Sequence, residues 1–440
     1  MKHYVLIISA VAALGGFLFG FDTAVISGVN PFIREFFDLD EILLGWANSS
    51  LILGAILGTL VAGKPGDWLG RRRTLMLTAL LFLISALGSA LAGSFTEFVI
   101  YRMIGGVAVG AASVISPIYI AEVAPAGQRG RLVSLNQLTI VTGIFVSFFS
   151  NYLLEQLTQN NWRWMLGVEA IPALLFLLLL VTVPESPRWL IINGQVERAR
   201  RVLSKWLSEA EVEEEIRDVQ SAHSAAVTAG VTVLLKPGYR KLALLGVVLA
   251  VFQQFTGINV IMYYAPLIFE RAGFGTGSAL LQTAAIGVIN CVFTILAMRF
   301  VDRLGRRPLL IVGAGSMAFF LFTLSLTFFA GRLDGYWVLL FIMGFIASFA
   351  ASYGPVVWVL ISEIFPNNIR GVAVSVATFA LWSANFIVTA TFPSMLARWD
   401  GGYTFLFYAA INVGSLFFVR AFIPETKGKS LEQLESELTA

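Results

Sequence analysis

Twelve long apolar runs divide the 440-residue chain, and most of the charged residues stand between them. A helix of about 20 apolar residues crosses the hydrocarbon core of a bilayer, so each run is long enough to form one span. The runs lie at about 5–29, 42–63, 74–93, 96–121, 132–153, 164–183, 241–269, 278–300, 308–330, 335–361, 371–396 and 402–423. A membrane barrel would show short alternating segments instead. We therefore predict an all-α membrane protein with twelve transmembrane helices, and the 57% hydrophobic composition excludes a soluble globular domain.

Lysine and arginine are distributed unevenly over the two sides that alternate along this topology. About 24 of the 30 fall on the side that holds both termini, and about five fall on the other side. The positive-inside rule therefore predicts that both termini lie in the cytoplasm. The first run is too long for the core of a signal peptide, and no small-residue cleavage site follows it, so we expect it to remain as a helix. The net charge of +3 reflects this topology and needs no nucleic-acid partner to explain it.

Three short charged motifs occur twice in the chain, about 240 residues apart. The pairs are Asp67-x-x-Gly70-Arg71-Arg72 with Asp302-x-x-Gly305-Arg306-Arg307, Glu122-x-x-Pro125-x-x-x-Arg129-Gly130 with Glu363-x-x-Pro366-x-x-x-Arg370-Gly371, and Pro184-Glu185-Ser186 with Pro424-Glu425-Thr426. The nearly constant offset indicates an internal duplication. We predict a six-helix bundle over 1–183, a linker over 184–240, a second six-helix bundle over 241–423 and a tail over 424–440. Duplicated halves in a membrane protein are typical of a transporter whose site lies between them.

The linker is the one long polar segment of the chain, and it carries a basic block at 197–203 and an acidic block at 211–217. Apolar residues recur there at three- and four-residue spacing, which predicts short amphipathic helices on the cytoplasmic side. Two interpretations stay open. The linker is either a simple tether, or a latch that packs on the inner ends of both halves and pairs its charged blocks with the Arg-rich turns.

The repeated motifs fit tight connections between helices at the cytoplasmic surface. Gly allows the turn, and the arginines can bond carboxylates or the carbonyls of helix ends as well as set the orientation. The predicted cytoplasmic latch consists of Asp67, Arg71, Arg72, Glu122, Arg129, Glu185, Arg188, Asp302, Arg306, Arg307, Glu363, Arg370 and Glu425. None of these residues is expected to perform chemistry on a substrate.

The sequence offers no catalytic or metal-binding set. Cys291 is the only cysteine and lies inside the eighth run, while the two histidines, His3 and His223, lie in a tail and a loop. Zinc sites need several cysteine or histidine ligands, and nucleophilic catalysis needs a nucleophile beside a base. We therefore expect neither an enzyme nor a bound cofactor.

Four motifs resemble those of the sugar porter family of the major facilitator superfamily. They are Arg102-x-x-x-Gly106-x-x-x-Gly110, Pro184-Glu185-Ser186-Pro187-Arg188-Trp189, Gln253-Gln254-x-x-Gly257-Ile258-Asn259 and Pro424-Glu425-Thr426-Lys427. The set is specific and covers essentially the whole chain, and it is most similar to bacterial proton-coupled sugar symporters. The resemblance implies the major facilitator fold. We expect a multi-pass protein of the cell inner membrane, in contact with the lipid bilayer, and nothing in the sequence requires more than a monomer. One departure is Trp68, where the family usually has an arginine, which places the strength of the first latch in question.

Uncharged amides and tryptophans deep in apolar spans suit a neutral sugar. An amide offers donors and an acceptor to hydroxyl groups, and an aromatic ring packs on the apolar face of a sugar. The candidate sugar-binding residues are Gln137, Gln253, Gln254, Asn259, Asn290, Gly354, Trp358, Trp382 and Asn385, for several of which the resemblance implies sugar contacts. Tyr263 and Tyr264 are predicted to form an outer gate, and Gly257 and Pro266 mark places where span seven can break or bend. The alternative is that the amides only join neighbouring helices.

A carboxyl group inside an apolar helix is costly, so Asp22 in span one needs a partner or a proton. Arg102 in span four is the natural partner, and Glu169 in span six is a second intramembrane carboxyl that can share the proton. If a conformational change separates Asp22 from Arg102, the carboxyl alternates between binding and releasing a proton. The alternative is a permanent Asp22–Arg102 salt bridge.

These observations predict a carrier that imports a monosaccharide with a proton by alternating access. A hexose such as glucose is preferred over a pentose such as xylose, and neighbours such as Ile144 and Leu381 are expected to tune the choice. A facilitative sugar uniporter of the same fold remains an alternative. A sugar-sensing receptor is a more distant one, because about 17 residues follow the last span and signalling needs a long tail.

Overall fold

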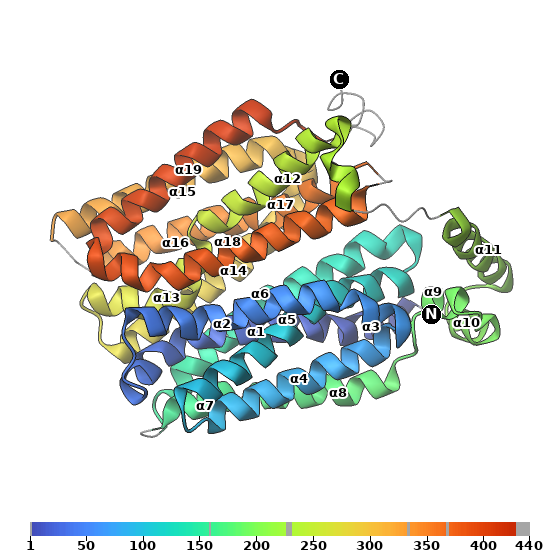
Figure 1. The fold of residues 1–440 in the computed structure, drawn as a ribbon, viewed down its shortest axis with the longest axis horizontal. Helices are drawn as coiled ribbons and strands as arrows, with labels where there is room; N and C mark the ends of the chain where they lie inside the picture. Colours follow the sequence, from blue (N-terminus) through green and yellow to red (C-terminus); the bar gives the residue numbers. More distant parts are fainter. Residues whose placement is uncertain (1, 158–159, 226–230, 332–334, 367–368, 428–440) are drawn as a thin grey trace. The chain divides into compact units, whose positions relative to one another are not determined.

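The computed structural model describes residues 2–157, 160–225, 231–331, 335–366 and 369–427 (Figure 1). Twelve of its helical segments are long and apolar enough to cross a membrane, which confirms the predicted spans. They are His3–Phe36, Glu41–Val61, Arg71–Leu91, Phe95–Val123, Arg129–Leu154, Asn161–Thr182, Tyr239–Arg271, Thr276–Val301, Arg306–Phe329, Gly335–Ile361, Arg370–Arg398 and Asp400–Phe422. Most of these helices begin or end a few residues outside the predicted apolar run, because the helix continues into the polar residues that flank the run.

Nine spans are single helices. They are α1 (Lys2–Phe36), α2 (Glu41–Val61), α4 (Arg71–Leu91), α5 (Phe95–Val123), α6 (Arg129–Leu154), α14 (Thr276–Leu304), α15 (Arg306–Phe329), α18 (Arg370–Arg398) and α19 (Asp400–Phe422). The start of α5 shows how local sequence sets such a boundary. The Ser94 hydroxyl accepts from the backbone N–H of Glu97, and the Glu97 carboxylate accepts from the backbone N–H of Ser94, which is a capping box.

Three spans are broken in the middle. Span six divides into α7 (Asn161–Gly167) and α8 (Ala170–Thr182), span seven into α12 (Pro237–Phe255) and α13 (Ile258–Arg271), and span ten into α16 (Gly335–Ala351) and α17 (Tyr353–Glu363). The break predicted at Gly257 is confirmed: its φ of +95° is a left-handed conformation that glycine adopts without a steric penalty. Pro266 lies within α13 and does not end it. The breaks in spans six and ten were not predicted.

The helices form two compact units, and the first consists of residues 1–23, 53–144 and 163–228. In this unit α4 packs against both α5 and α8. Three helices follow α8: α9 (Pro187–Ile192), α10 (Val196–Leu203) and α11 (Glu209–Ala225). Helix α9 contacts α5, α10 and α11, so the first part of the linker belongs to this unit. The predicted short helices of the linker are therefore present, and their cytoplasmic position stays a prediction.

The second unit consists of residues 24–52, 145–162 and 229–440. Its core is formed by α15 packed on α16 and α19, α14 on α16, and α12 on α18. The unit also includes the end of α1, the start of α2 and the end of α6. A hydrogen bond of 2.8 Å from Asn30 Nδ2 to the Tyr263 carbonyl ties the end of α1 to α13. The sequence predicts domain boundaries after residues 183, 240 and 423. These boundaries follow the duplication of the sequence and not the contacts that define the two compact units, so they stay a prediction.

Candidate functional site

Asp22 and Arg102 form a buried ion pair inside the first unit. Both residues are 1% exposed, Asp22 on α1 and Arg102 on α5. One terminal nitrogen of the guanidinium donates to Asp22 Oδ1, and the other donates to the Asp22 backbone carbonyl at 3.1 Å. Arg102 therefore holds both the side chain and the main chain of Asp22. Asp22 Oδ2 and Arg102 Nε have no hydrogen-bond partner among the described residues, so the pair keeps capacity for further bonds.

Glu169 lies in the gap between α7 and α8, where span six is interrupted. Its side chain is 1% exposed, and the charges of Asp22 and Arg102 act on its carboxyl group. Its Oε1 atom also has no partner within the part of the chain that the structure describes. Two buried carboxyl groups therefore lie near one guanidinium, which bonds directly to Asp22. If both carboxyls were ionised, the group would carry an uncompensated charge away from water, which is costly, so this arrangement favours holding one proton.

The amide side chains of span seven form a chain of hydrogen bonds at its break. Gln253 Nε2 donates to the Tyr353 carbonyl at 3.0 Å, Gln254 Nε2 donates to Gln253 Oε1 at 3.4 Å, and Asn259 Nδ2 donates to Gln254 Oε1 at 2.5 Å. Gln253 and Gln254 lie in the last turn of α12, and Asn259 lies in the first turn of α13. The turn at Gly257 between the two helices therefore brings all three side chains together. The predicted cluster is therefore a structural unit whose amides bond to each other.

All the other candidate sugar residues except Gln137 lie on helices that contact α12 or α13. Helix α12 contacts α17 and α18, and α13 contacts α14 and α18. Asn290, Trp382 and Asn385 are buried on α14 and α18, whereas the side chain of Trp358 on α17 is 40% exposed. Asn385 Oδ1 accepts from the Thr389 hydroxyl at 3.0 Å. Gly354 lies in the first turn of α17, and Gln137 is half-buried on α6 in the first unit. Their roles in sugar binding stay predictions.

The two tyrosines predicted as a gate are held firmly within the second unit. The Tyr264 hydroxyl donates to the Thr389 carbonyl at 2.8 Å, and its ring lies 5.1 Å from that of Phe392. The Tyr263 carbonyl accepts from Asn30, and Asn30 Nδ2 also donates to Asn48 Oδ1 at 3.2 Å. Asn30 and Asn48 were not predicted, although a buried amide in each of two neighbouring apolar runs is a visible signal. The pair links the hairpin of α1 and α2 to the tyrosine segment.

The first copy of the charged motifs forms a connected network. Arg71 Nε donates to Glu122 Oε2 at 3.0 Å, and one terminal nitrogen of Arg71 donates to Asp67 at 3.0 Å. Glu122 also accepts from the Ser186 hydroxyl at 2.5 Å, and Glu185 accepts from the backbone N–H of Arg72 at 2.9 Å. The exposed Trp68 does not prevent these bonds, so the first network forms without an arginine at that position.

The second copy has the same design with different residues. Arg306 donates to Glu363 Oε1 at 2.9 Å, and Glu363 Oε2 accepts from the Thr426 hydroxyl at 2.6 Å. The carboxylate of Glu425 accepts from the backbone N–H groups of Arg306 and Arg307, each at 3.1 Å. The duplication seen in the sequence is therefore also a duplication of hydrogen-bond geometry. Gly70 and Gly305 have φ values of +97° and +90°, which lets the same turn form beneath Glu185 and Glu425.

The remaining latch residues have separate positions. Arg129 Nε donates to the Ala121 carbonyl at 3.0 Å, and Arg370 Nε donates to the Phe365 carbonyl at 3.1 Å, so both close the turns before their helices. The side chain of Arg188 is exposed on α9 and has no hydrogen-bond partner within the described ranges. The side chain of Asp302 lies outside the described residues.

The charged blocks of the linker pair with each other. Arg200 forms ion pairs with Glu197 and with Glu213, which joins α10 to α11. Lys205 donates to the Tyr4 hydroxyl at 3.0 Å, and the Trp206 ring packs near that of Tyr4. The Trp189 indole N–H donates to the Asp67 carbonyl at 2.7 Å. Of the two interpretations left open, the one in which these blocks pair with the Arg-rich turns differs from these contacts, which fasten the linker through aromatic and backbone groups.

Comparison with known proteins places the chain among carriers. A family model described as "Sugar (and other) transporter" matches residues 8–438. The D-xylose-proton symporter of Escherichia coli K12 is 43% identical over 99% of this chain and 96% of its own length. The arabinose-proton symporter of Bacillus subtilis is 38% identical over 98% and 94%, and the glucose transport protein of a Synechocystis strain is 42% identical over 98% and 97%.

Solved structures agree with these relatives. The inward-open conformation of the xylose transporter from E. coli matches with a TM-score of 0.88 and 42% identity over 99% of this chain and 100% of that one. The predicted major facilitator fold is thereby confirmed. The relatives include pentose and hexose carriers, so they do not support the expected preference for a hexose.

Proposed function

Because the chain belongs to the sugar transporter family of the major facilitator superfamily, we propose that it imports a monosaccharide together with a proton by alternating access. The observation that carries the proposal is a second buried carboxyl group, Glu169, near the buried ion pair of Asp22 and Arg102. A permanent structural ion pair needs only one carboxylate for its arginine. The second carboxyl gives the site a place for a proton, which supports coupling rather than facilitated diffusion.

The sugar is proposed to bind at the amide cluster of span seven. Each amide in the chain from Tyr353 to Asn259 already bonds to another amide or to a carbonyl. A sugar hydroxyl can replace such a bond because it donates and accepts as the amides do. The proposed contacts also include Gln137, Asn290, Trp358, Trp382 and Asn385, as the sequence predicts. The amide groups themselves carry no charge, in keeping with a neutral ligand.

The sugar is proposed to be a pentose or hexose, with D-xylose the first to be tested. Two of the relatives described above are named for the pentoses xylose and arabinose, and a third is named for glucose. Ile144 and Leu381 are apolar, so they offer no hydrogen bond to an additional hydroxyl group. A thermal-shift screen over pentoses, hexoses and polyols identifies the ligand by the largest rise in melting temperature.

Orientation and movement complete the proposal. Both termini lie in the cytoplasm, which the excess of lysine and arginine on that side supports. The two charged networks would hold the inner ends of each half as rigid bodies while the halves rock. Tyr263 and Tyr264 would act as a gate at the outer end, where the Tyr263 carbonyl accepts from Asn30 and the Tyr264 hydroxyl donates to the Thr389 carbonyl.

Uptake into proteoliposomes under an imposed pH gradient tests the coupling. The Asp22→Asn variant keeps the shape of the side chain but cannot carry a carboxyl proton, so we expect it to exchange sugar without accumulating it. Asp38→Asn, at an exposed carboxyl, is the matched control and should accumulate sugar as the wild type does. If Asp22→Asn accumulates sugar uphill as well as the wild type, coupling through this site is wrong.

A facilitative uniporter of the same fold is the second candidate. Only symport removes protons from the medium when sugar enters, so sugar added to unbuffered, de-energised cells should make the medium more alkaline. A sugar flux with no change in external pH would favour the uniporter.

A further inference from the structure

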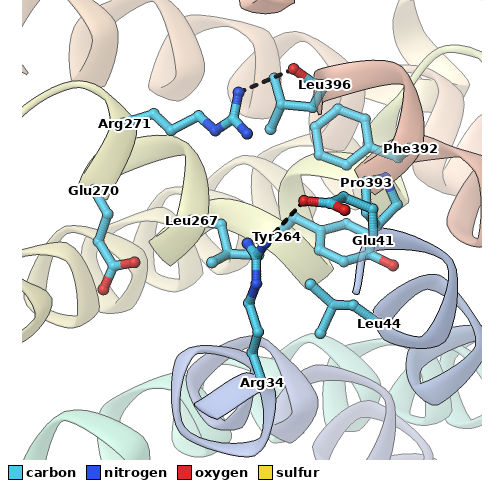
Figure 2. A pocket seen from close by; sticks show the side chains of 10 residues that line it. All are labelled: Arg34, Glu41, Leu44, Tyr264, Leu267, Glu270, Arg271, Phe392, Pro393 and Leu396. Atoms are coloured by element: carbon cyan, nitrogen blue, oxygen red, sulfur yellow. Dashed lines mark hydrogen bonds and ion pairs between the residues drawn. The ribbon is translucent and has the colours of Figure 1, made fainter. Parts of the chain in front are cut away.

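A cavity of about 270 Å³ opens within the second unit, away from the amide cluster. The cavity is lined by four helix ends: the end of α1, the start of α2, the end of α13 and the end of α18 (Figure 2). Counting spans from the N-terminus places all four of these ends on the side opposite both termini. None of the candidate sugar residues on α12, α14 and α17 lines the cavity, so it is separate from the central site.

The walls of the cavity combine charged groups of both signs with aromatic rings. Arg34 and Glu41 form an ion pair of 2.8 Å at its edge, and Glu270 and Arg271 lie on α13. Figure 2 shows Arg34 and Arg271 on opposite sides, with the rings of Tyr264 and Phe392 along a wall. Two arginines and two glutamates leave no net charge, which disfavours an ionic ligand and suits a neutral one.

The polar groups match hydroxyls that both donate and accept. Glu270 accepts from the Thr276 hydroxyl at 2.8 Å, and a carboxylate has room for several acceptor bonds. One nitrogen of Arg271 donates to the Leu396 carbonyl at 2.9 Å, and a guanidinium carries five N–H donors. Neighbouring hydroxyl groups of a sugar ring can bridge such carboxylates and guanidinium groups, while the ring face packs on an aromatic side chain.

The size of the cavity points to a small ligand that exchanges freely. Pockets for drug-sized ligands range from about 300 to 1,000 Å³, so a cavity of 270 Å³ suits a single sugar ring. The Arg34 side chain is 41% exposed, which shows that the cavity opens to solvent. An open, shallow site with few contacts binds a small ligand weakly, in the millimolar range.

We infer that this cavity is a second, outer docking site for a monosaccharide, distinct from the amide cluster. The inference rests on the proposed function, since it takes the transported sugar as the ligand. The buried Tyr264 forms part of the wall and is one of the two residues of the predicted gate. A sugar held here rests against the closed gate and enters the central site when the gate opens. The site raises the local sugar concentration on the outer side only.

Saturation-transfer NMR with D-xylose and with D-glucose on the purified full-length protein in nanodiscs detects such weak binding. The Gln254→Ala variant weakens the central site, so we expect a millimolar signal to remain. Adding Leu267→Trp fills the cavity with an indole and should abolish that signal. Leu43→Trp is the matched control, because Leu43 is exposed on α2 beside the cavity-lining Leu44 and does not line the cavity. It should leave the signal unchanged.

Glu270→Gln supplies a second variant that keeps the volume of the side chain. Loss of the charge should weaken outer binding about fivefold, since bonds to charged groups are about twice as strong as neutral ones. In transport assays both cavity variants should raise the KM for entry about threefold and leave the KM for exit unchanged. If Leu267→Trp does not fold, the sugar binding measured with Glu270→Gln tests the outer site by itself.

The outcomes separate the two proposals. A signal that disappears entirely in Gln254→Ala, or that persists in both cavity variants, overturns the outer site while sugar transport stands. Absence of any sugar binding to the wild type overturns the proposed function and the outer site together.

Discussion

The two halves share a frame but differ in what they bury. At the charged turns Arg71, Glu122 and Glu185 make the bonds that Arg306, Glu363 and Glu425 make in the other half. Inside the membrane spans the copies diverge. The first half buries two carboxyl groups and a guanidinium, whereas the second half buries a chain of neutral amides. The repeated part sets the geometry, and the diverged part sets the chemistry.

The difference has a physical basis in the cost of burial. An ionised group inside a protein must be paired, so Asp22 and Arg102 depend on each other closely. A buried amide needs only a neutral hydrogen-bond partner, and exchanging that partner for a sugar hydroxyl changes no charge. The first half is therefore suited to respond to protons and the second to neutral ligands. Three comparisons between variants test how sharp this division is.

Removing the guanidinium should have the largest effect. Arg102→Met leaves two buried carboxyls without a cation, and breaking a buried pair in this way costs about 3–5 kcal/mol. Gln253→Met is the comparison in the second half, where loss of a neutral hydrogen bond costs about 1–3 kcal/mol. Melting temperatures of the two variants in the same detergent measure the difference. Equal losses would show that the buried charges are no more critical than the amides.

Truncating the amide should act on the sugar rather than on the proton. Gln254→Ala removes a group that bonds Gln253 and Asn259, and we expect the central sugar affinity to fall about tenfold, or about 1.4 kcal/mol. Titration of purified protein with the transported sugar measures the change. Asn151→Ala is the control, because Asn151 is a buried amide that donates to the Val25 carbonyl and should affect stability alone. Unchanged sugar affinity in Gln254→Ala would remove span seven from the site.

Removing one charge from either of the two charged networks should lower the stability by the same amount, and this loss should be the smallest of the three effects. Glu122→Gln and Glu363→Gln each keep a hydrogen-bond acceptor but lose the charge that pairs with an arginine, for an expected loss of about 1 kcal/mol. Glu197→Gln, at a carboxylate that is 80% exposed, is the control and should change stability by less than about 0.5 kcal/mol. Thermal unfolding of the three variants measures these changes in stability. A large loss in one copy only would show that the duplicated networks no longer have equal roles.

Much of the fold could be predicted because the signals are local. Each apolar run is one span regardless of its neighbours, and the φ-permissive Gly257 marks the break in span seven within a few residues. The pairing of Asp22 with Arg102 was also predictable, because a buried charge in an apolar helix requires an opposite charge. The breaks at Glu169 and Ser352 were missed although Gly167 and Gly354 lie beside them, and neither of these glycines adopts the positive φ that Gly257 has in span seven.

The sequence by itself determined the number of spans, the duplication and the identities of the groups that must be paired. Hydrophobic length and the cost of unpaired charge act on each segment alone, so they can be read without coordinates. Only the tertiary structure decided which groups meet. In the tertiary structure Asn30 donates to the Tyr263 carbonyl, and Arg200 pairs with Glu213 inside the linker. The outer cavity forms between helices that are distant in the chain. Such contacts depend on helix packing between remote segments, where many side chains of similar chemistry compete and geometry alone selects the partner.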